Sequence, residues 1–211
     1  MEWHKRRGRL AAWAWTVSLC LVAVVAEATN VAPAVAVIAR FQNTLLTAMK
    51  KGPQIGFHGR YRILAPAVRE SHNLAYIAQI TVGPYWPRLS PTQHAAFIKV
   101  FTRLTVATYA AQFKSYSGEQ FKETAAHAVG RGDVLVETKL VAHGHKEATL
   151  DYLLAPSGAD WKIVNIVANG VSDLALKRAQ YTAIIHRKGF PALLDLLRSK
   201  VAQLSHARKA A

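Results

Sequence analysis

The stretch "DYLLAPSGADWKIVNIVANGVS", residues 151–172, predicts two β-strands on either side of the turn "PSGAD". Simple alternation divides the apolar residues of the second strand between two faces: Trp161, Ile163 and Val167 on one, and Val164, Ile166 and Ala168 on the other. A strand with one wet face should alternate apolar and polar residues, and this one does not. We therefore expect both faces of the sheet to be covered here, one of them by the protein's own helices.

Two further strand patterns precede this stretch, at residues 121–129 and 134–142, and its own first strand covers residues 148–155. The turn-forming sequences "GRGD" and "HGHK" separate these three strands. Together with residues 161–168 they predict a four-stranded antiparallel meander.

Helical patterns flank the strands on both sides. Apolar residues at helical spacing predict a helix over residues 31–50, which ends before Gly52 and Pro53. Two shorter helices are predicted over residues 60–70 and 74–82. After the strands, Ser172 should cap a helix that runs to about His186 and ends at Gly189. Residues 190–204 then form a last amphipathic helix.

The sequence "SPTQ" at residues 90–93 predicts a helix start. Ser90 can cap the first free amides, Pro91 suits the first helical position, and Gln93 can reach back to the amide of Ser90. This helix should run to about Tyr116 and end at Gly118. It is apolar around most of its circumference, which is typical of a helix buried on more than one side.

This order of elements indicates the fold class. Runs of helix, then strands, then helix predict an α+β fold in which helices pack on a curved four-stranded antiparallel sheet, an NTF2-like arrangement. The length of 211 residues and the 51% hydrophobic content suit one domain with a sizeable core.

The N-terminus has the pattern of a signal peptide. Four basic residues between positions 5 and 9 precede an apolar run from Leu10 to Ala26, and "AEA" at residues 26–28 supplies a small-x-small cleavage site. We expect cleavage after Ala28, so that residues 1–28 are a signal peptide and residues 29–211 a single domain; the alternative is an uncleaved membrane anchor. Cys20, the only cysteine, lies in the removed segment, and a disulfide-free exported domain suits the bacterial periplasm.

The chain is strongly basic. Removal of residues 1–28 changes the formal net charge from +15 to +13, because that segment holds four basic and two acidic residues. An exported protein without a known nucleic-acid motif is not expected to bind nucleic acid. An anionic membrane surface or an acidic protein partner fits the charge, and so does a simple solvated face.

The sequence lacks the usual arrangements of catalytic residues. It has no G-x-S-x-G, H-E-x-x-H, C-x-x-C or glycine-rich phosphate loop, and we expect neither enzymatic activity nor a cofactor. His143 and His145 flank a turn but have no third ligand nearby, so no metal site is predicted. Asp133 and Glu137 share a strand face, where carboxylates are more often solvent-facing charges than an acid/base pair.

Apolar side chains are more numerous than one helical layer on a sheet requires. Part of the apolar surface of the helix over residues 90–116 and of the strands could close around an apolar ligand. A tightly filled core is the competing interpretation.

Several segments, in the same order, resemble one known family. "FTRLTVATYAAQFKSYSGEQF" at residues 101–121 resembles the signature helix of the MlaC, or toluene-tolerance, family of periplasmic lipid-binding proteins, with its Phe, mid-helix Tyr and final Tyr-x-Gly. The stretch at residues 151–172 shares three features with that family: an Asp followed by an aromatic residue, a Trp after a turn, and a final small-x-Gly-Val-Ser sequence. "YRILAPAV" at residues 61–68 and "RKGFPALLDLL" at residues 187–197 add two further similarities. The sequences "VGPYW" and "LDYLL" resemble most closely the hopanoid-associated HpnM branch.

The resemblance implies a function. Members of this family carry lipid in a deep apolar pocket between helices and sheet, as auxiliary components of an ABC transporter that maintains outer-membrane lipid asymmetry. It implies phospholipid or hopanoid as ligand, and as partners an inner-membrane transport complex and an outer-membrane lipoprotein complex, or a hopanoid exporter for the HpnM-like branch. We expect a monomer whose residues 29–211 form a lipid-binding domain. Lipid would then cover part of the second face of strand 161–168.

Pattern and resemblance together nominate lipid-binding residues. They are Phe101, Leu104, Tyr109, Phe113, Leu153, Ile163, Val167, Val171 and Ile185. Arg60, Arg62 and Arg69 are candidates for contact with a head group or an acidic partner, or are solvated surface charges. Two alternatives stay open at this point: a periplasmic adaptor with a filled core and no lipid cargo, and a hydrolase on the same fold.

Overall fold

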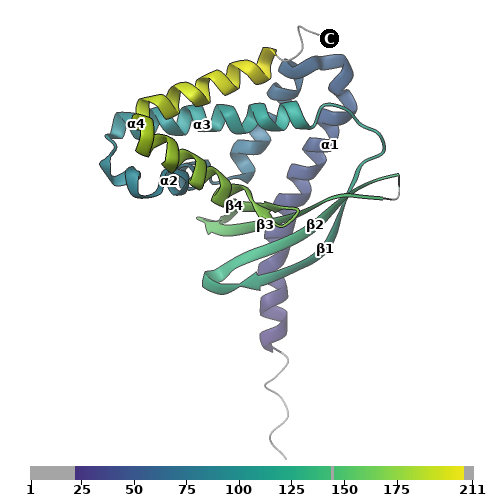
Figure 1. Ribbon diagram of the computed structural model, residues 1–211. Helices are drawn as coiled ribbons and strands as arrows, with labels where there is room; N and C mark the ends of the chain where they lie inside the picture. Colours follow the sequence, from purple (N-terminus) through teal and green to yellow (C-terminus); the bar gives the residue numbers. More distant parts are fainter. Residues whose placement is uncertain (1–21, 144, 207–211) are drawn as a thin grey trace, which may run out of the picture.

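The computed structural model describes residues 22–143 and 145–206 (Figure 1). Its helices are α1 (Val22–Ser71), α2 (Leu74–Val82), α3 (Pro91–Gln112) and α4 (Asp173–His206), with short 3₁₀ helices at Gly83–Arg88 and Gly130–Gly132. Its strands are β1 (Gln120–Val129), β2 (Asp133–Ala142), β3 (His145–Ser157), β4 (Asp160–Ala168) and β5 (Val171–Ser172). All neighbouring strands are antiparallel, in the order β1-β2-β3-β4-β5.

The helices form a layer on one side of the sheet. Figure 1 shows α2, α3 and α4 gathered above the sheet while α1 runs across it, which confirms the predicted α+β arrangement. The largest fully buried side chains come from both layers and include Phe41 and Leu45 of α1, Phe97 and Phe101 of α3, and Tyr152 of β3. The core therefore lies between the helices and the sheet.

The sheet has five strands, and the prediction of four was wrong. Asn169 and Gly170 both adopt positive φ, 50° and 80°, and thereby turn the chain tightly enough for Val171 and Ser172 to pair with β4. Asn-Gly is the preferred pair for such a two-residue hairpin turn. The added strand is only two residues long, because Ser172 already caps α4 by accepting the amide hydrogen of Ala175.

A β-bulge corrects the predicted faces of β4. Ile163 pairs with Leu154, but Ile166 rather than Val167 occupies the corresponding position opposite Tyr152, because the register shifts at Val164. Ile163 and Ile166 therefore lie on the helix side with the buried Tyr152 and Leu154. A bulge changes which residues face the core, since it places two residues of one strand opposite one of its neighbour. The predicted assignment of these residues to the two faces, which assumed unbroken alternation, was therefore wrong.

The first predicted helix continues past its expected end. The α1 helix runs through Gly52 and Pro53, and its backbone first leaves helical geometry at Gly56, with φ 61° and ψ −170°. The predicted helix over residues 60–70 is the part of α1 beyond that break, and α2 spans the predicted residues 74–82. A Cβ atom at Gly52 would lie 2.1 Å from the carbonyl oxygen of Lys114, so Gly52 permits the close approach of the chain that follows α3.

Arg60 connects the break in α1 to the end of α3. Its buried guanidinium donates from Nε to the carbonyl of Ala110 (2.8 Å) and from Nη1 to the carbonyl of Gly52 (3.0 Å). A basic side chain that bonds carbonyls of a last helical turn stabilises the helix end there. This contact fits the observation that α3 ends at Gln112, four residues before the predicted end at Tyr116.

The start of α3 and the division of α4 agree with the predictions. The amide of Gln93 donates to Ser90 Oγ, and the amide of Ser90 donates to the Gln93 side chain, so the capping box is complete. In α4, Gly189 has φ 80° and ψ 165° and separates the two predicted helical parts.

Within residues 22–143 and 145–206, Val31–Ser71 is the one helical segment long and apolar enough to cross a membrane. Its apolar residues Ile38, Phe41, Leu45 and Val68 are at most 2% exposed, which is typical of a core helix. Residues 1–21, most of the predicted signal peptide, lie outside the described part of the chain. The cleavage after Ala28 stays a prediction.

Replacement of Arg60 should destabilise the fold. Arg60→Leu leaves the buried carbonyls of Gly52 and Ala110 without the guanidinium, and we expect the free energy of unfolding to fall by about 2–4 kcal/mol. Arg62→Leu, at an exposed position two residues away, is the control and should stay within about 0.5 kcal/mol of the wild type. Urea denaturation monitored by circular dichroism measures both. Equal effects of the two substitutions would contradict the structural role of Arg60.

Candidate functional site

A cavity of about 670 Å³ lies between the helix layer and strands β3 and β4. This volume is in the range of small-molecule and cofactor sites, which are concave and mostly apolar. All four helices contribute to the wall: Leu45 comes from α1, Ile77 from α2, Phe101 from α3 and Tyr181 from α4. The cavity thus lies between the two layers, with both buried and exposed residues in its wall.

Five of the nominated residues line this cavity. They are Phe101, Leu104, Tyr109 and Phe113, from α3 and its C-terminal end, and Ile163 from β4. The wall also contains apolar residues that the sequence analysis did not nominate, among them Leu74, Leu150, Val164, Ile166 and Leu174. These come from α2, β3, β4 and α4, so the apolar wall extends well beyond the nominated set.

The other four nominated residues lie elsewhere. Leu153 and Val167 belong to the opposite face of the sheet, because the bulge at Val164 shifts the phase of β4. Val171 is 57% exposed in β5. Ile185 is buried in α4, in the general core and not in the cavity wall.

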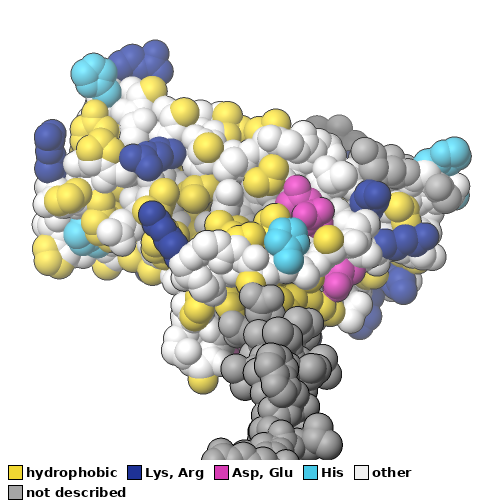
Figure 2. All heavy atoms as spheres, turned by 90° about the horizontal axis from the view of Figure 1, so that it is seen from below, with side chains coloured by type: hydrophobic (Ala, Val, Ile, Leu, Met, Phe, Trp, Pro, Cys, Tyr) yellow, Lys and Arg dark blue, Asp and Glu magenta, His cyan; other side chains and the backbone are white. Residues whose placement is uncertain are grey.

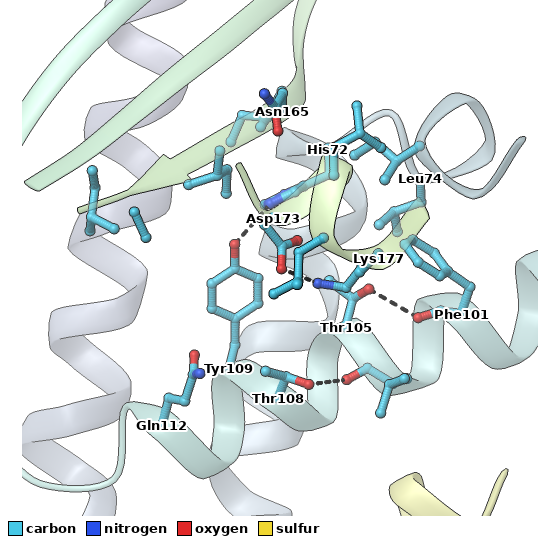
Figure 3. Close-up of a pocket in the computed structure, with 18 of the residues that line it drawn as sticks. His72, Leu74, Phe101, Thr105, Thr108, Tyr109, Gln112, Asn165, Asp173 and Lys177 are labelled. Atoms are coloured by element: carbon cyan, nitrogen blue, oxygen red, sulfur yellow. Dashed lines mark hydrogen bonds and ion pairs between the residues drawn. The ribbon is translucent and has the colours of Figure 1, made fainter. Parts of the chain in front are cut away.

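Polar members of the wall were also missed. Thr105, Thr108 and Gln112 continue the helical spacing that begins at Phe101 and lie along one side of α3 (Figure 3). That spacing was visible in the sequence, but the search was confined to apolar residues. His72 had no comparable signal, because it follows α1 and reaches the cavity only through the packing of α1 on β4.

His72 and Tyr109 form a polar contact inside the apolar wall. The two side chains point toward each other in Figure 3, with 3.1 Å between His72 Nε2 and Tyr109 Oη. Ser71 Oγ lies 2.8 Å from the other ring nitrogen, Nδ1. Phe41 packs edge-on against both rings, at centroid distances of 5.0 Å from His72 and 5.2 Å from Tyr109.

Burial changes the acid–base properties of these groups. Desolvation lowers the pKa of His72 to about 3; a hydrogen bond to the backbone of Val68 opposes this shift without reversing it, and the positive charge of Lys162 adds to it. Desolvation also raises the pKa of Tyr109 well above its ordinary value and that of Tyr152 to about 12. At neutral pH these three side chains are therefore uncharged, and the inner wall presents hydrogen-bonding groups without formal charge.

Charged residues of the cavity come from α4. Asp173 and Lys177 form an ion pair one helical turn apart, with side chains 52% and 24% exposed. Lys200 and Gln203, both exposed, line the cavity from the second part of the same helix. The exposure of these side chains places the charges toward solvent, whereas Phe101, Leu104 and Ile163 supply a buried apolar wall.

The three nominated arginines do not lie at the cavity. Arg60 is 4% exposed and holds backbone carbonyls, so its nomination as a head-group ligand was wrong. Arg62 and Arg69 are exposed on α1 and are absent from the cavity wall. In the described part of the chain no group of three or more His, Cys, Asp or Glu side chains could hold a metal ion.

Similarity to known proteins agrees with this geometry. The family model described as "MlaC protein" matches residues 39–199, which is most of the chain. The chain belongs to the MlaC protein family. Two individual proteins are also similar to this chain.

One is a curated MlaC relative, the intermembrane phospholipid transport system binding protein MlaC of Haemophilus influenzae. It is 22% identical over 135 residues, and the match spans 62% of this chain and 63% of that protein, just under two thirds of its length. The other is a solved structure of the phospholipid-binding protein from Ralstonia solanacearum in complex with a phospholipid. It aligns with a TM-score of 0.71 and 21% identity and covers 80% of this chain and 97% of its own. The two chains share one fold.

The buried His72 should make the stability of this MlaC family member depend on pH. The unfolded histidine takes up a proton below pH 6.5, whereas the folded one does so only near pH 3, so stability is present above pH 6.5 and is lost as the pH falls. We expect the free energy of unfolding to drop by up to about 1.4 kcal/mol per pH unit in this window, on the order of 4 kcal/mol in all.

His72→Gln should remove this part of the pH dependence. Urea denaturation of both proteins between pH 7 and pH 3 measures the difference. His58→Gln, at an exposed position, is the control and should behave as the wild type. Parallel stability curves for the wild type and His72→Gln would show that His72 does not remain neutral in the folded protein.

Proposed function

We propose that this protein is a periplasmic carrier that binds phospholipid in the cavity and shuttles it between inner- and outer-membrane complexes without chemical conversion. The observation that carries the proposal is the cavity of about 670 Å³ in the core of an MlaC family member, with a mostly apolar wall. A filled core, as the adaptor alternative requires, would not leave this volume between Phe101, Leu104 and Ile163.

The relatives support phospholipid as the cargo class. One is named as the binding protein of an intermembrane phospholipid transport system, and the other was solved with a phospholipid bound. In this chain the acyl chains would lie along Phe101, Leu104 and Phe113. The head group would lie near the partly exposed Lys177 and the exposed Lys200, whose positive charges suit a phosphate.

The energetics favour carriage with the help of partners. Burial of each methylene contributes about 0.8 kcal/mol, but most of this gain replaces what the bilayer already supplied. The net affinity of the carrier can therefore be close to that of the membrane. Transfer in either direction then requires a partner that opens the cavity, and an inner-membrane transport complex and an outer-membrane lipoprotein complex would serve as donor and acceptor for a monomeric carrier.

The periplasm is the compartment that this role requires. The segment 1–28, with its basic stretch and apolar run, would direct export and be cleaved after Ala28. Lys and Arg side chains stand singly or in small groups over the face shown in Figure 2, among apolar and polar ones. Such a distribution suits transient contact with an anionic membrane or an acidic partner.

Hopanoid is the alternative cargo within the same proposal. The similarity of "VGPYW" and "LDYLL" to the HpnM branch is its support. A rigid ring system and flexible acyl chains both require an apolar wall, so the two ligands are separated by direct identification.

The first experiment identifies the bound lipid. The protein is exported to the periplasm in a hopanoid-producing bacterium, purified without detergent, extracted and analysed by mass spectrometry. Stoichiometric phospholipid supports the proposal as stated, and stoichiometric hopanoid supports the HpnM-like alternative. Well-folded protein without any lipid would contradict both and favour the adaptor.

A bulky side chain in the cavity should prevent binding. Thr108 is half-buried on α3 and lines the cavity, so Thr108→Trp should fill part of the volume and reduce the co-purified lipid at least about tenfold. Thr102→Trp places the same side chain on the same helix outside the cavity wall and is the matched control. Mass spectrometry of lipid per mole of protein gives the readout. Equal lipid content in the two variants would place the ligand elsewhere.

A further inference from the structure

Three residues of α3 that line the cavity carry hydroxyl groups: Thr105, Thr108 and Tyr109. Thr105 donates its proton to the carbonyl of Phe101 (3.0 Å), and Thr108 donates to the carbonyl of Leu104 (2.9 Å). Since a hydroxyl group has a single proton, both threonines offer only oxygen lone pairs to a ligand as long as these bonds are kept.

The proton of Tyr109 is fixed by a chain of three contacts that starts outside the cavity. Ser71 Oγ lies 2.6 Å from the carbonyl oxygen of Ala67, and a carbonyl can only accept, so Ser71 is the donor. With its single proton used, Ser71 Oγ can only accept from His72, which lies 2.8 Å away through Nδ1. The hydrogen of the imidazole ring therefore sits on Nδ1.

The contact with Tyr109 takes its direction from this tautomer. Burial lowers the pKa of His72 to about 3, so the ring is neutral and holds one hydrogen only. Nε2 then has a lone pair, and Tyr109 must donate its phenolic proton across the 3.1 Å contact. If Tyr109 turned this proton toward a ligand, Nε2 would be left buried without a partner, which is costly.

We infer that α3 presents an acceptor-only oxygen of Tyr109 to the cavity, and that the cavity selects lipids with a buried hydrogen-bond donor, such as a hydroxyl group, over lipids with only ether or ester oxygens there. This inference rests on the proposed function and adds the chemical class preferred by the same site. The lysines of α4 have the complementary character, because Lys177 and Lys200 can only donate. Acceptors of a ligand fit near these lysines, and a donor fits at Tyr109.

The proton of Tyr181, a further phenol of the wall, is not fixed by this chain. Tyr181 lies on α4, away from the Ser71–His72–Tyr109 contacts. Tyr181 therefore offers a matched control: it is a buried phenol of the cavity whose hydroxyl can serve a donor or an acceptor.

The test compares two ligands of similar size, octadecanol and octadecyl methyl ether, in competition with a fluorescent phospholipid bound to the purified protein. The ratio of the two affinities within each protein is the readout, since partial loss of stability affects both ligands alike. Because Tyr109→Phe alone would leave the Nε2 lone pair of His72 as a substitute acceptor, the double variant His72→Phe/Tyr109→Phe is used to remove both acceptors. It should lower the alcohol-to-ether ratio about fivefold relative to the wild type, the effect of one hydrogen bond. Tyr181→Phe should leave the ratio unchanged.

A second variant tests the direction of the contact while keeping the phenol in place. His72→Phe retains a flat ring but removes Nε2, the acceptor of the Tyr109 proton, so that this proton should turn to the cavity. The ether can accept this proton, and we expect the ratio to fall at least as far as in the double variant. A merely structural role of His72 would weaken both ligands equally and leave the ratio as in the wild type.

The outcomes separate this inference from the proposed function. Equal ratios in the wild type and the double variant His72→Phe/Tyr109→Phe, with lipid still bound, would overturn the donor preference alone. An unchanged ratio in His72→Phe would overturn the assigned direction of the contact and with it the inference. Failure of both ligands and of the fluorescent phospholipid to bind the wild type would overturn the proposed function as well.

Discussion

The junction between the end of α1 and strand β4 is the constraint on which the rest of the structure depends. The amide of Asn73 donates to the carbonyl of Ile163 at 2.9 Å, and His72 bridges to the same strand residue as an isolated parallel pair. These main-chain contacts attach the helix layer to the sheet at one fixed point. The cavity adjoins this point, since His72 and Ile163 both line it.

The residues near this junction also explain why a cavity with polar groups is stable. Gln42 donates to Thr138 (3.1 Å) and Tyr152 (3.4 Å), so α1 contacts the sheet through satisfied polar side chains as well as apolar ones. Among the described residues no buried side-chain nitrogen or oxygen lacks a hydrogen-bond partner. A ligand is therefore not needed to satisfy the wall, and its binding is governed by apolar burial, with hydrogen bonds deciding which lipids fit.

Charge has more than one role in this basic protein. Arg60 is buried and connects Gly52 with Ala110, so it serves the fold. Lys177 pairs with Asp173 in the first turn of α4, where the carboxylate also suits the positive end of the helix dipole. Exposed basic side chains remain on several elements, among them α1, α3, α4 and β1, and are available to membranes or acidic partners. Net charge alone did not distinguish between these uses.

The sequence by itself determined most of the elements of the structure and, through them, part of the cavity wall. Local signals suffice for the elements: the capping box at Ser90, the turn-forming "GRGD" and the left-handed Gly189 each act within a few residues. The nominated residues of α3 lie in the wall because helical spacing alone places Phe101, Leu104 and Tyr109 on one side. Only the tertiary structure decided what depends on distant contacts. The bulge at Val164 reverses the later part of β4, so Val167 lies away from the cavity although alternation had placed it beside Ile163. Arg60 and His72 take their roles from groups that packing between layers brings to them, and no local pattern encodes that packing.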